Sequence, residues 1–229
     1  MFSGLFHSLA ILSLSVGLVS AAWMLVTVRR NPPHMKVMAW VWPLCALFLG
    51  PVLIRFHARH GGHGSQSDGK PGFATIAKGT LHCGAGCALA DMIAETLALL
   101  FPAMLAAFGL HWFISEKIFA AWVFDFVLAL SFGIAFQYFA IAPMRNLGLA
   151  EGLREAIKAD TLSLTCWQIG MYGFMALAHF WFFPQVLGRA YDAGTPEFWF
   201  AMQGAMIAGF ITAFPINRWL ISRGIKEAM

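Results

Sequence analysis

The residues that could do chemistry gather in one stretch, Thr80–Glu95, which contains one histidine, two cysteines and two carboxylates. The cysteines and carboxylates follow one another at intervals of four residues, so on a helix they lie along one slowly drifting face. They are Cys83, Cys87, Asp91 and Glu95. Ionisable groups within an apolar helix are costly and are usually functional, so this face marks the candidate site.

Soft-metal binding is the first chemistry that these residue types indicate. Thiolates and imidazole select copper(I) or zinc, and Cys83 and Cys87 can chelate one ion from one helix face. The carboxylates would orient a ligand or take up the protons that binding releases. Copper is the first candidate and zinc the alternative. The predicted metal-site residues are His82, Cys83, Cys87, Asp91, Glu95 and Cys166.

The same cysteines allow two other functions. Cycling between dithiol and disulfide would make a membrane thiol oxidoreductase. Residues four apart in an unbroken helix have Cα atoms about 6 Å apart, near the upper limit for a disulfide. Gly84 and Gly86 could break the helix and relax this limit, but no Cys-x-x-Cys is present. Alternatively, Gly79, Cys83 and Cys87 are small residues that only allow close helix packing, as in an assembly subunit without a site.

The two carboxylates carry alternatives of their own. Asp91 and Glu95 could form a proton relay, since a charge near the membrane midplane usually faces a partner or water. They could equally be protonated carboxyls that hold helices together through Gln168 or Thr165.

Composition places the candidate site in a membrane protein. Charged residues make up 11% of the 229 residues, against about 25% in a soluble domain. Mean hydropathy is +0.70, and the net charge of +4 is expected where Lys and Arg collect in cytoplasmic loops. We therefore expect lipid around the protein and no nucleic acid as a partner. The motif adds a metal ion as an expected partner, and a homo-oligomer is compatible with the sequence. A non-enzymatic role is favoured.

Apolar runs predict an all-α polytopic transmembrane bundle of about six spans with a four-helix core. The chain divides into a two-helix membrane region at 1–54, a His/Gly-rich flexible loop at 55–79 and a four-helix transmembrane core at 80–229. The expected spans are residues 8–28, 37–54, 80–110, 118–142, 161–184 and 198–221.

Loop charge predicts a multi-pass protein of the prokaryotic inner membrane with both termini inside. Ten Lys and Arg residues lie on the side of the 55–79 loop and five on the other, although Arg29 and Arg30 favour the reverse. A rise of about 1.5 Å per residue places Cys87, Cys166 and several polar residues in one layer on that side. The others are Thr165, Gln137, Tyr138 and Asn217.

Other soft or titratable groups carry weaker predictions. His57, His60 and His63 are interpreted first as part of a solvated linker, and weak metal collection is the alternative. The methionines are expected to fill the core or face lipid. His111 and His179 invite a bis-histidine haem, but interfacial positions explain them better, so haem is disfavoured.

Several segments resemble an uncharacterised family of prokaryotic integral membrane proteins with a T-x-H-C-G-x-G-C motif. They are 79–87 (GTLHCGAGC), Asp91, Glu95, 136–145 (FQYFAIAPMR), 158–165 (KADTLSLT), 167–172 (WQIGMY) and 223–229 (RGIKEAM). The family is catalogued as a domain of unknown function, and some members carry a copper oxidase label. The resemblance covers about residues 75–229 and implies a four-helix membrane core whose first helix opens with the motif. Cys166 and Ala90 depart from the expected small residue and glycine, so Cys166 is no general ligand.

Overall fold

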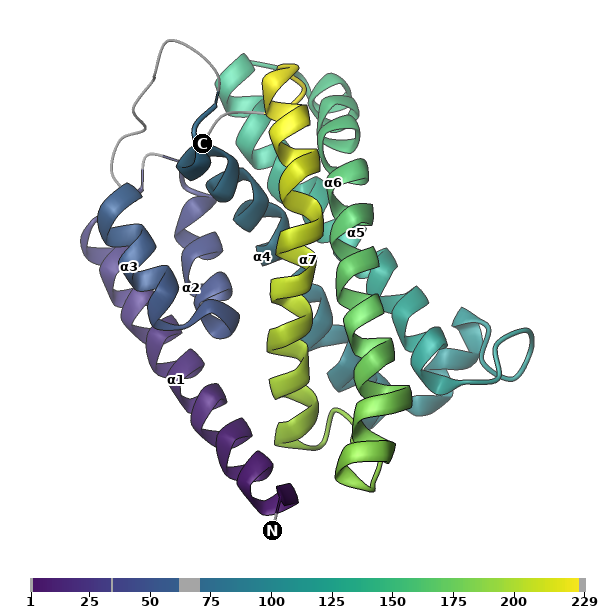
Figure 1. Ribbon diagram of the computed structural model, residues 1–229. Helices are drawn as coiled ribbons and strands as arrows, with labels where there is room; N and C mark the ends of the chain where they lie inside the picture. Colours follow the sequence, from purple (N-terminus) through teal and green to yellow (C-terminus); the bar gives the residue numbers. More distant parts are fainter. Residues whose placement is uncertain (1, 34, 62–70, 227–229) are drawn as a thin grey trace.

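The structure is a computed structural model that describes residues 2–33, 35–61 and 71–226, and over these ranges it is helical (Figure 1). The prediction of an all-α protein is confirmed. The elements are α1 (Phe2–Arg30), α2 (Met38–Leu49), α3 (Pro51–His60), α4 (Phe73–Leu100), η1 (Pro102–Phe108), α5 (Lys117–Arg145), α6 (Leu149–Leu177), η2 (Ala178–Leu187) and α7 (Pro196–Ser222).

Four helices in the described part of the chain are long and apolar enough to cross a membrane, which indicates a membrane protein. They are α1, α4, α5 and α7. The six expected spans included two more. Of these, α2 has only 12 residues, and α6 carries charged residues along its first half.

The second expected span, 37–54, is divided in two. Gly50 adopts a φ of +54°, a conformation that glycine tolerates best, and it ends α2. Pro51 then occupies the first position of α3, where its missing N–H is not needed. The prolines thus produce a break between two short helices instead of one kinked span.

The predicted 55–79 loop is shorter in the structure than in the sequence analysis. Helix α3 extends to His60, and α4 already begins at Phe73, so its first turns precede the predicted start at residue 80. The remaining part of that loop includes His63, which lies outside the described residues.

Helix α4 is the centre of the bundle and contacts α2, α5, α6 and α7. Its side chains are buried without interruption from Ile76 to Ala88, a segment rich in glycine, alanine and cysteine. A Cβ on Gly86 would lie 3.3 Å from the backbone nitrogen of Gly133, so α4 and α5 cross backbone against backbone. Small residues therefore let four helices surround the His-Cys segment.

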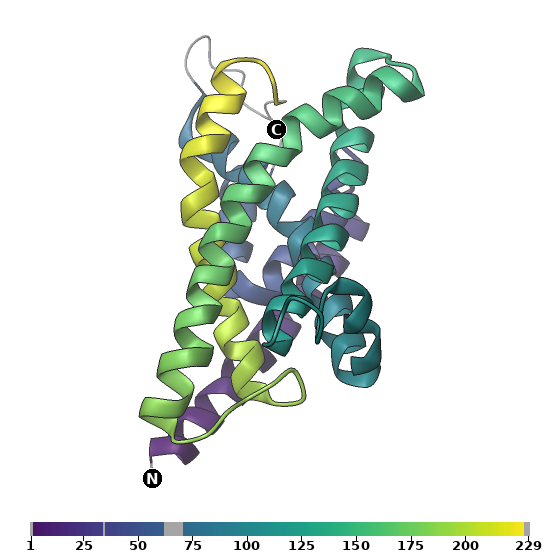
Figure 2. The same cartoon turned by 90° about the vertical axis from the view of Figure 1, so that its right-hand side faces the viewer.

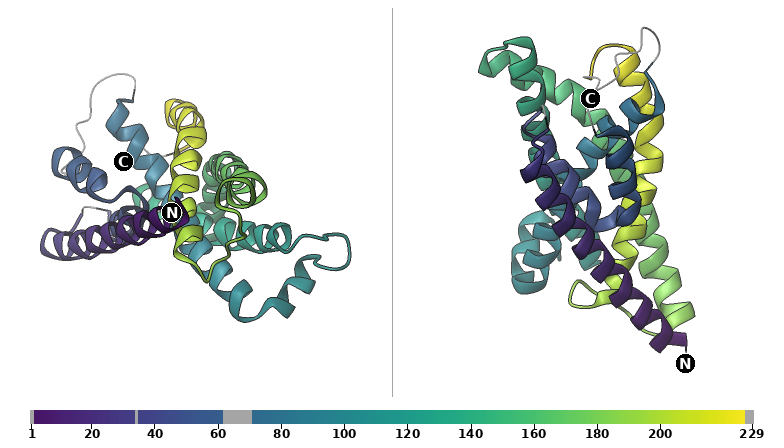
Figure 3. Two further views of the ribbon diagram at one scale, coloured as in Figure 1. Left: turned by 60° about the horizontal axis from the view of Figure 1, so that its bottom comes forward. Right: turned by 90° about the vertical axis from the view of Figure 1, so that its left-hand side faces the viewer.

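The N-terminal helices pack against one side of this core. Figure 3 shows α1 lying obliquely beside α2 and α3, away from the projecting segment that contains η1. Helix α1 also contacts α7, and α2 contacts both α4 and α7. On another side α6 and α7 run alongside each other (Figure 2). The expected N-terminal region is thus joined to the core through α4 and α7.

Candidate functional site

The predicted polar face of α4 points into the protein. Cys83 and Cys87 are fully buried, His82 is 1% exposed and Asp91 is 3% exposed. None of these side chains lies on the outer surface, where lipid would be. The face predicted from the four-residue spacing is therefore enclosed by neighbouring helices.

The two motif cysteines lie together. The Cys83 thiol contacts the Cys87 thiol, and it also lies against the carboxyl of Asp160 on α6. The Cys45 thiol of α2 donates a hydrogen bond to the Leu81 carbonyl oxygen at 3.2 Å, half a turn before Cys83. All four cysteines of the chain are free thiols. Three helices thus bring thiol and carboxyl groups to the middle of the motif.

His82 points in a different direction from the cysteines. Its ring lies edge-on to Phe136 of α5, with 6.1 Å between ring centroids. The backbone of Phe136 also lies within hydrogen-bond reach of the ring. Adjacent residues on a helix point about 100° apart, so His82 faces α5 while Cys83 faces α6.

Cys166 is half-buried, one position before the buried Trp167 on α6. Its carbonyl oxygen accepts a hydrogen bond of 2.7 Å from Thr212 of α7. Among the residues that the structure describes, no three His, Cys, Asp or Glu side chains form a group that could hold a metal. The six predicted ligands therefore do not make one coordination sphere, and metal ligation stays a prediction.

A buried lysine lies at the end of the bundle where α7 ends. Lys226 is 1% exposed, and its ammonium donates to Asn217 Oδ1 at 2.8 Å and to Ser163 Oγ at 3.4 Å. Asn217 also donates to Ser163 Oγ at 2.8 Å. One turn before Ser163, fully buried Asp160 interacts electrostatically with Lys226. A charged and hydrogen-bonded cluster therefore begins beside the thiols.

A pair of carboxyl groups lies on the other side of the thiols. The Asp91 and Asp125 carboxyls, from α4 and α5, share a hydrogen bond. Asp125 Oδ2 also accepts from Gln168 Nε2 at 3.1 Å and lies 2.7 Å from the Tyr172 hydroxyl. The two carboxyls are therefore close enough to exchange a proton.

Tyr172 lies beside the same carboxyl pair, and its hydroxyl has two possible hydrogen-bond acceptors. Its hydroxyl lies 3.0 Å from the Trp122 carbonyl oxygen, and its ring stacks on the Trp122 ring at 4.7 Å. One hydroxyl hydrogen can serve only one acceptor at a time. The hydroxyl can thus donate to Asp125, or it can donate to the Trp122 carbonyl oxygen and leave its own oxygen free to accept from a protonated Asp125.

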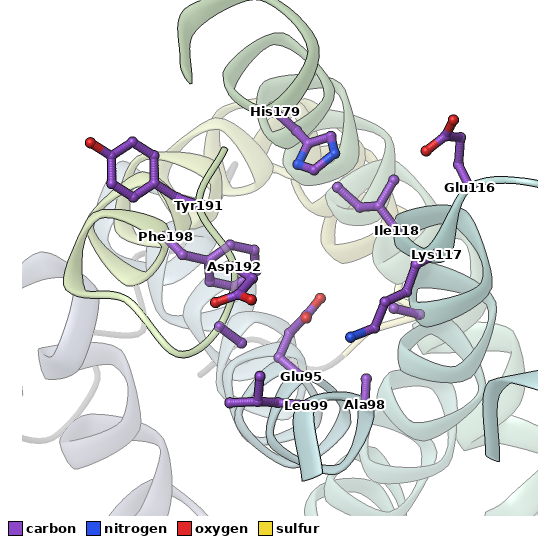
Figure 4. A pocket seen from close by; sticks show the side chains of 12 residues that line it. Glu95, Ala98, Leu99, Glu116, Lys117, Ile118, His179, Tyr191, Asp192 and Phe198 are labelled. Carbon is purple, nitrogen blue, oxygen red and sulfur yellow. The ribbon is translucent and has the colours of Figure 1, made fainter. Parts of the chain in front are cut away.

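Glu95 connects the carboxyl pair to a cavity near the opposite end of the bundle. It interacts electrostatically with Asp125 and with Lys117 of α5. Figure 4 shows Glu95 and Lys117 pointing into this cavity, with Asp192 and His179 facing them. The cavity measures about 110 Å³ and is also lined by Glu116, so we call it the acidic cavity.

These groups form a polar column through the bundle, from the end of α7 to the acidic cavity. Its members are Lys226, Asn217, Ser163, Asp160, Cys83, Cys87, Asp91, Asp125 and Glu95. Along and beside it lie further buried polar side chains: His82, Gln137, Trp167 and Gln168. Burying polar groups is costly, so this concentration indicates a functional interior.

Two histidines of the predicted 55–79 loop, His57 and His60, contact aromatic rings. The His57 ring lies edge-on to Trp42 at 4.8 Å, and the His60 ring lies 5.1 Å from Phe56. Burial, together with the nearby charge of Lys78, lowers the pKa of His57. A lower pKa favours the neutral ring, which suits its packing on Trp42.

The sequence analysis missed several members of the column. It gave no role to Asp125, Tyr172 or Lys226. The position of Asp125 follows from the antiparallel register at the close approach of Gly86 and Gly133, which the structure shows and the sequence does not. That register places Asp125 beside the turn of α4 that follows Asp91.

Comparison with known proteins gives one match. The family described as Domain of unknown function (DUF4396) matches residues 73–226. No curated protein and no solved structure shows significant similarity to the chain. The match begins at the first residue of α4 and includes every member of the polar column. The chain therefore belongs to the DUF4396 family.

Proposed function

We propose that the protein binds or moves a soft transition metal, copper before zinc, through the thiols of Cys83 and Cys87. The observation that carries this proposal is the contact of the two thiols inside the bundle, with the Cys45 thiol anchored beside them. Thiolates are the ligands that copper(I) prefers. The ligand set is narrower than the sequence analysis expected, because His82 faces α5 and Cys166 is half-buried.

The redox alternative is less well supported by the same geometry. Helix α4 continues unbroken through Gly84 and Gly86, so the relaxation that a disulfide would need is not available. A metal ion tolerates this arrangement better, since two thiolates on one helix face can both reach an ion beyond the helix surface.

The setting that we propose is the inner membrane of a prokaryote, with the protein as a multi-pass component. Helices α2 and α6 would lie within the bilayer beside the four long apolar helices, for about six membrane segments. The distribution of Lys and Arg supports cytoplasmic termini.

The metal proposal predicts the metal content of the purified protein. We expect copper in the wild-type chain, isolated in detergent without added metal, and about a tenfold loss or more in the Cys83→Ser/Cys87→Ser variant, because serine oxygen is a hard ligand. Elemental analysis measures this directly. Cys166→Ser is the matched control and should retain wild-type copper. Equal, near-zero copper and zinc in all three proteins would refute the proposal.

Proton transfer is a second candidate role, favoured by the hydrogen bond between Asp91 and Asp125. Thiols lose protons when a metal binds, and the carboxyl pair with Glu95 offers a route to the acidic cavity.

Asp125→Asn tests this role with little disturbance of packing, because the amide oxygen still accepts from Gln168 and Tyr172. In liposomes containing a pH-sensitive dye, we expect the pH change that follows addition of copper(I) to slow about tenfold or more. Glu151→Gln is the control, because Glu151 is exposed on α6 and lies outside the polar column. An Asp125→Asn rate equal to the wild-type rate would remove Asp125 from the path.

A further inference from the structure

A second cavity lies between the N-terminal helices and the family domain. It measures about 370 Å³ and is lined by residues of α1, α2, α4 and α7, of which Leu18 is exposed. Its lining residues are Leu14, Leu18, Leu47, Phe48, Ala88, Asp91, Met92, Thr96, Trp199, Met202, Gln203 and Met206. Three of these are methionines, so we call it the methionine cavity.

The methionines present soft donor atoms to this space. Met202 and Met206 are four residues apart on α7, which places both on one face, and each is buried. Met92 lies on α4, beside Asp91. A methionine side chain has three rotatable bonds and a polarizable thioether, so three of them can converge on one ion.

Two polar side chains that line the methionine cavity, Gln203 and Asp91, differ in their hydrogen bonds. Gln203 donates to the Leu47 carbonyl oxygen at 2.7 Å and accepts from Ser13 at 2.7 Å, so its amide is engaged. Asp91 is 3% exposed, and no N–H or hydroxyl of the described residues donates to its Oδ2. Its carboxyl lines the same cavity as the side chains of the three methionines.

We propose that the methionine cavity is a second soft-metal site, formed by Met92, Met202 and Met206 with Asp91, for a monovalent cation of the copper(I) or silver(I) class. Thioethers are soft, neutral ligands that favour copper(I) over zinc. The carboxyl of Asp91 would complete the ligand set beside the three thioethers, since it lines the same cavity. The site deepens the proposed function and rests on it, since Cys87 lies one turn of α4 from Asp91.

Filling of a gap in the core is the ordinary role of methionine, and the test separates it from ligation. Methionine and leucine have similar volumes, so Met→Leu largely preserves packing while removing the sulfur. The triple variant Met92→Leu/Met202→Leu/Met206→Leu therefore removes the donors specifically. Met171→Leu/Met175→Leu is the matched control, because these methionines are buried but lie outside the cavity lining.

The experiment is equilibrium dialysis of the full chain in detergent against silver(I), with bound metal counted by elemental analysis. We expect about two silver ions per wild-type chain, about one in the triple leucine variant and about two in the control. Cys83→Ser/Cys87→Ser should lose the other ion. Zinc binding should be unchanged in the triple variant.

The outcomes separate the two proposals. Wild-type silver content in the triple leucine variant would overturn the methionine site, and the cysteine variant would still decide the thiol site independently. Unchanged silver in both variants would overturn both sites. A loss of zinc equal to the loss of silver in the triple variant would overturn the assignment to monovalent cations.

Discussion

Adding a methyl group to Gly84 or Gly209 is expected to destabilise the bundle strongly, because both glycines face the indole of Trp167. A Cβ on Gly209 would lie 2.6 Å from Trp167 Nε1, and a Cβ on Gly84 would lie 2.8 Å from Trp167 Cζ2 and nearer still to another ring atom. The indole is fully buried between α4 and α7, so it cannot move aside. Overpacking costs about 1–3 kcal/mol or somewhat more at each site.

Thermal unfolding in detergent, followed by the helical circular dichroism signal, measures this effect. Gly173→Ala is the matched control, since its Cβ would meet nothing within 4 Å. Alanine in a helix is favoured over glycine by roughly 0.5–1 kcal/mol, so that control should be neutral or slightly stabilised. Trp167→Phe should recover part of the loss in Gly84→Ala, because the smaller ring vacates space. A Gly84→Ala variant that melts like Gly173→Ala would refute the packing described here.

Lys226→Met is expected to cost about 1–3 kcal/mol, because it leaves the buried side chains of Asn217 and Ser163 without the hydrogen bonds that the ammonium donates. Lys226 is the buried cation that interacts with Asp160, and its ammonium also satisfies Asn217 and Ser163. Without it, fully buried Asp160 faces the core with no opposite charge.

A second substitution shows whether the charge is the cause. Lys226→Met/Asp160→Asn should regain part of the lost stability, because neither buried charge is then left alone. Lys158→Met on α6 is the control. Its partner Glu155 lies on the surface, where such pairs contribute about 0–1 kcal/mol. Thermal unfolding of the four proteins decides the matter, and equal melting of Lys226→Met and Lys158→Met would contradict the charge coupling.

The buried face of α4 could be predicted because helical spacing alone determines which residues share a side. The interval of four residues placed Cys83, Cys87 and Asp91 together, and these side chains lie inside the bundle. His82 could not be separated from them by composition, since only the neighbouring α5 shows that it faces Phe136.

The partners of these residues depended on helix register and on chain reversals that leave little sequence signal. Asp125 meets Asp91 because α4 and α5 cross where both carry glycine. Lys226 enters the core because Gly224, with a φ of +66°, turns the chain back after α7. A tail with a basic residue reads equally well as a membrane-surface anchor, so this contact could not be foreseen.

The close crossing of α4 and α5 has a mechanical consequence. Where Gly86 meets Gly133, backbone rests on backbone, and no side chain lies between the two helices to absorb sliding. In an alternating-access cycle, the crossing of α4 and α5 at this pair of glycines would therefore stay fixed while other helices moved. The moving part would be the wall formed by α1 and α2, which borders the methionine cavity and lies outside residues 73–226. Movement of that wall would expose the polar column sideways to the bilayer. The fixed crossing of α4 and α5 would meanwhile keep the carboxyls of the column aligned.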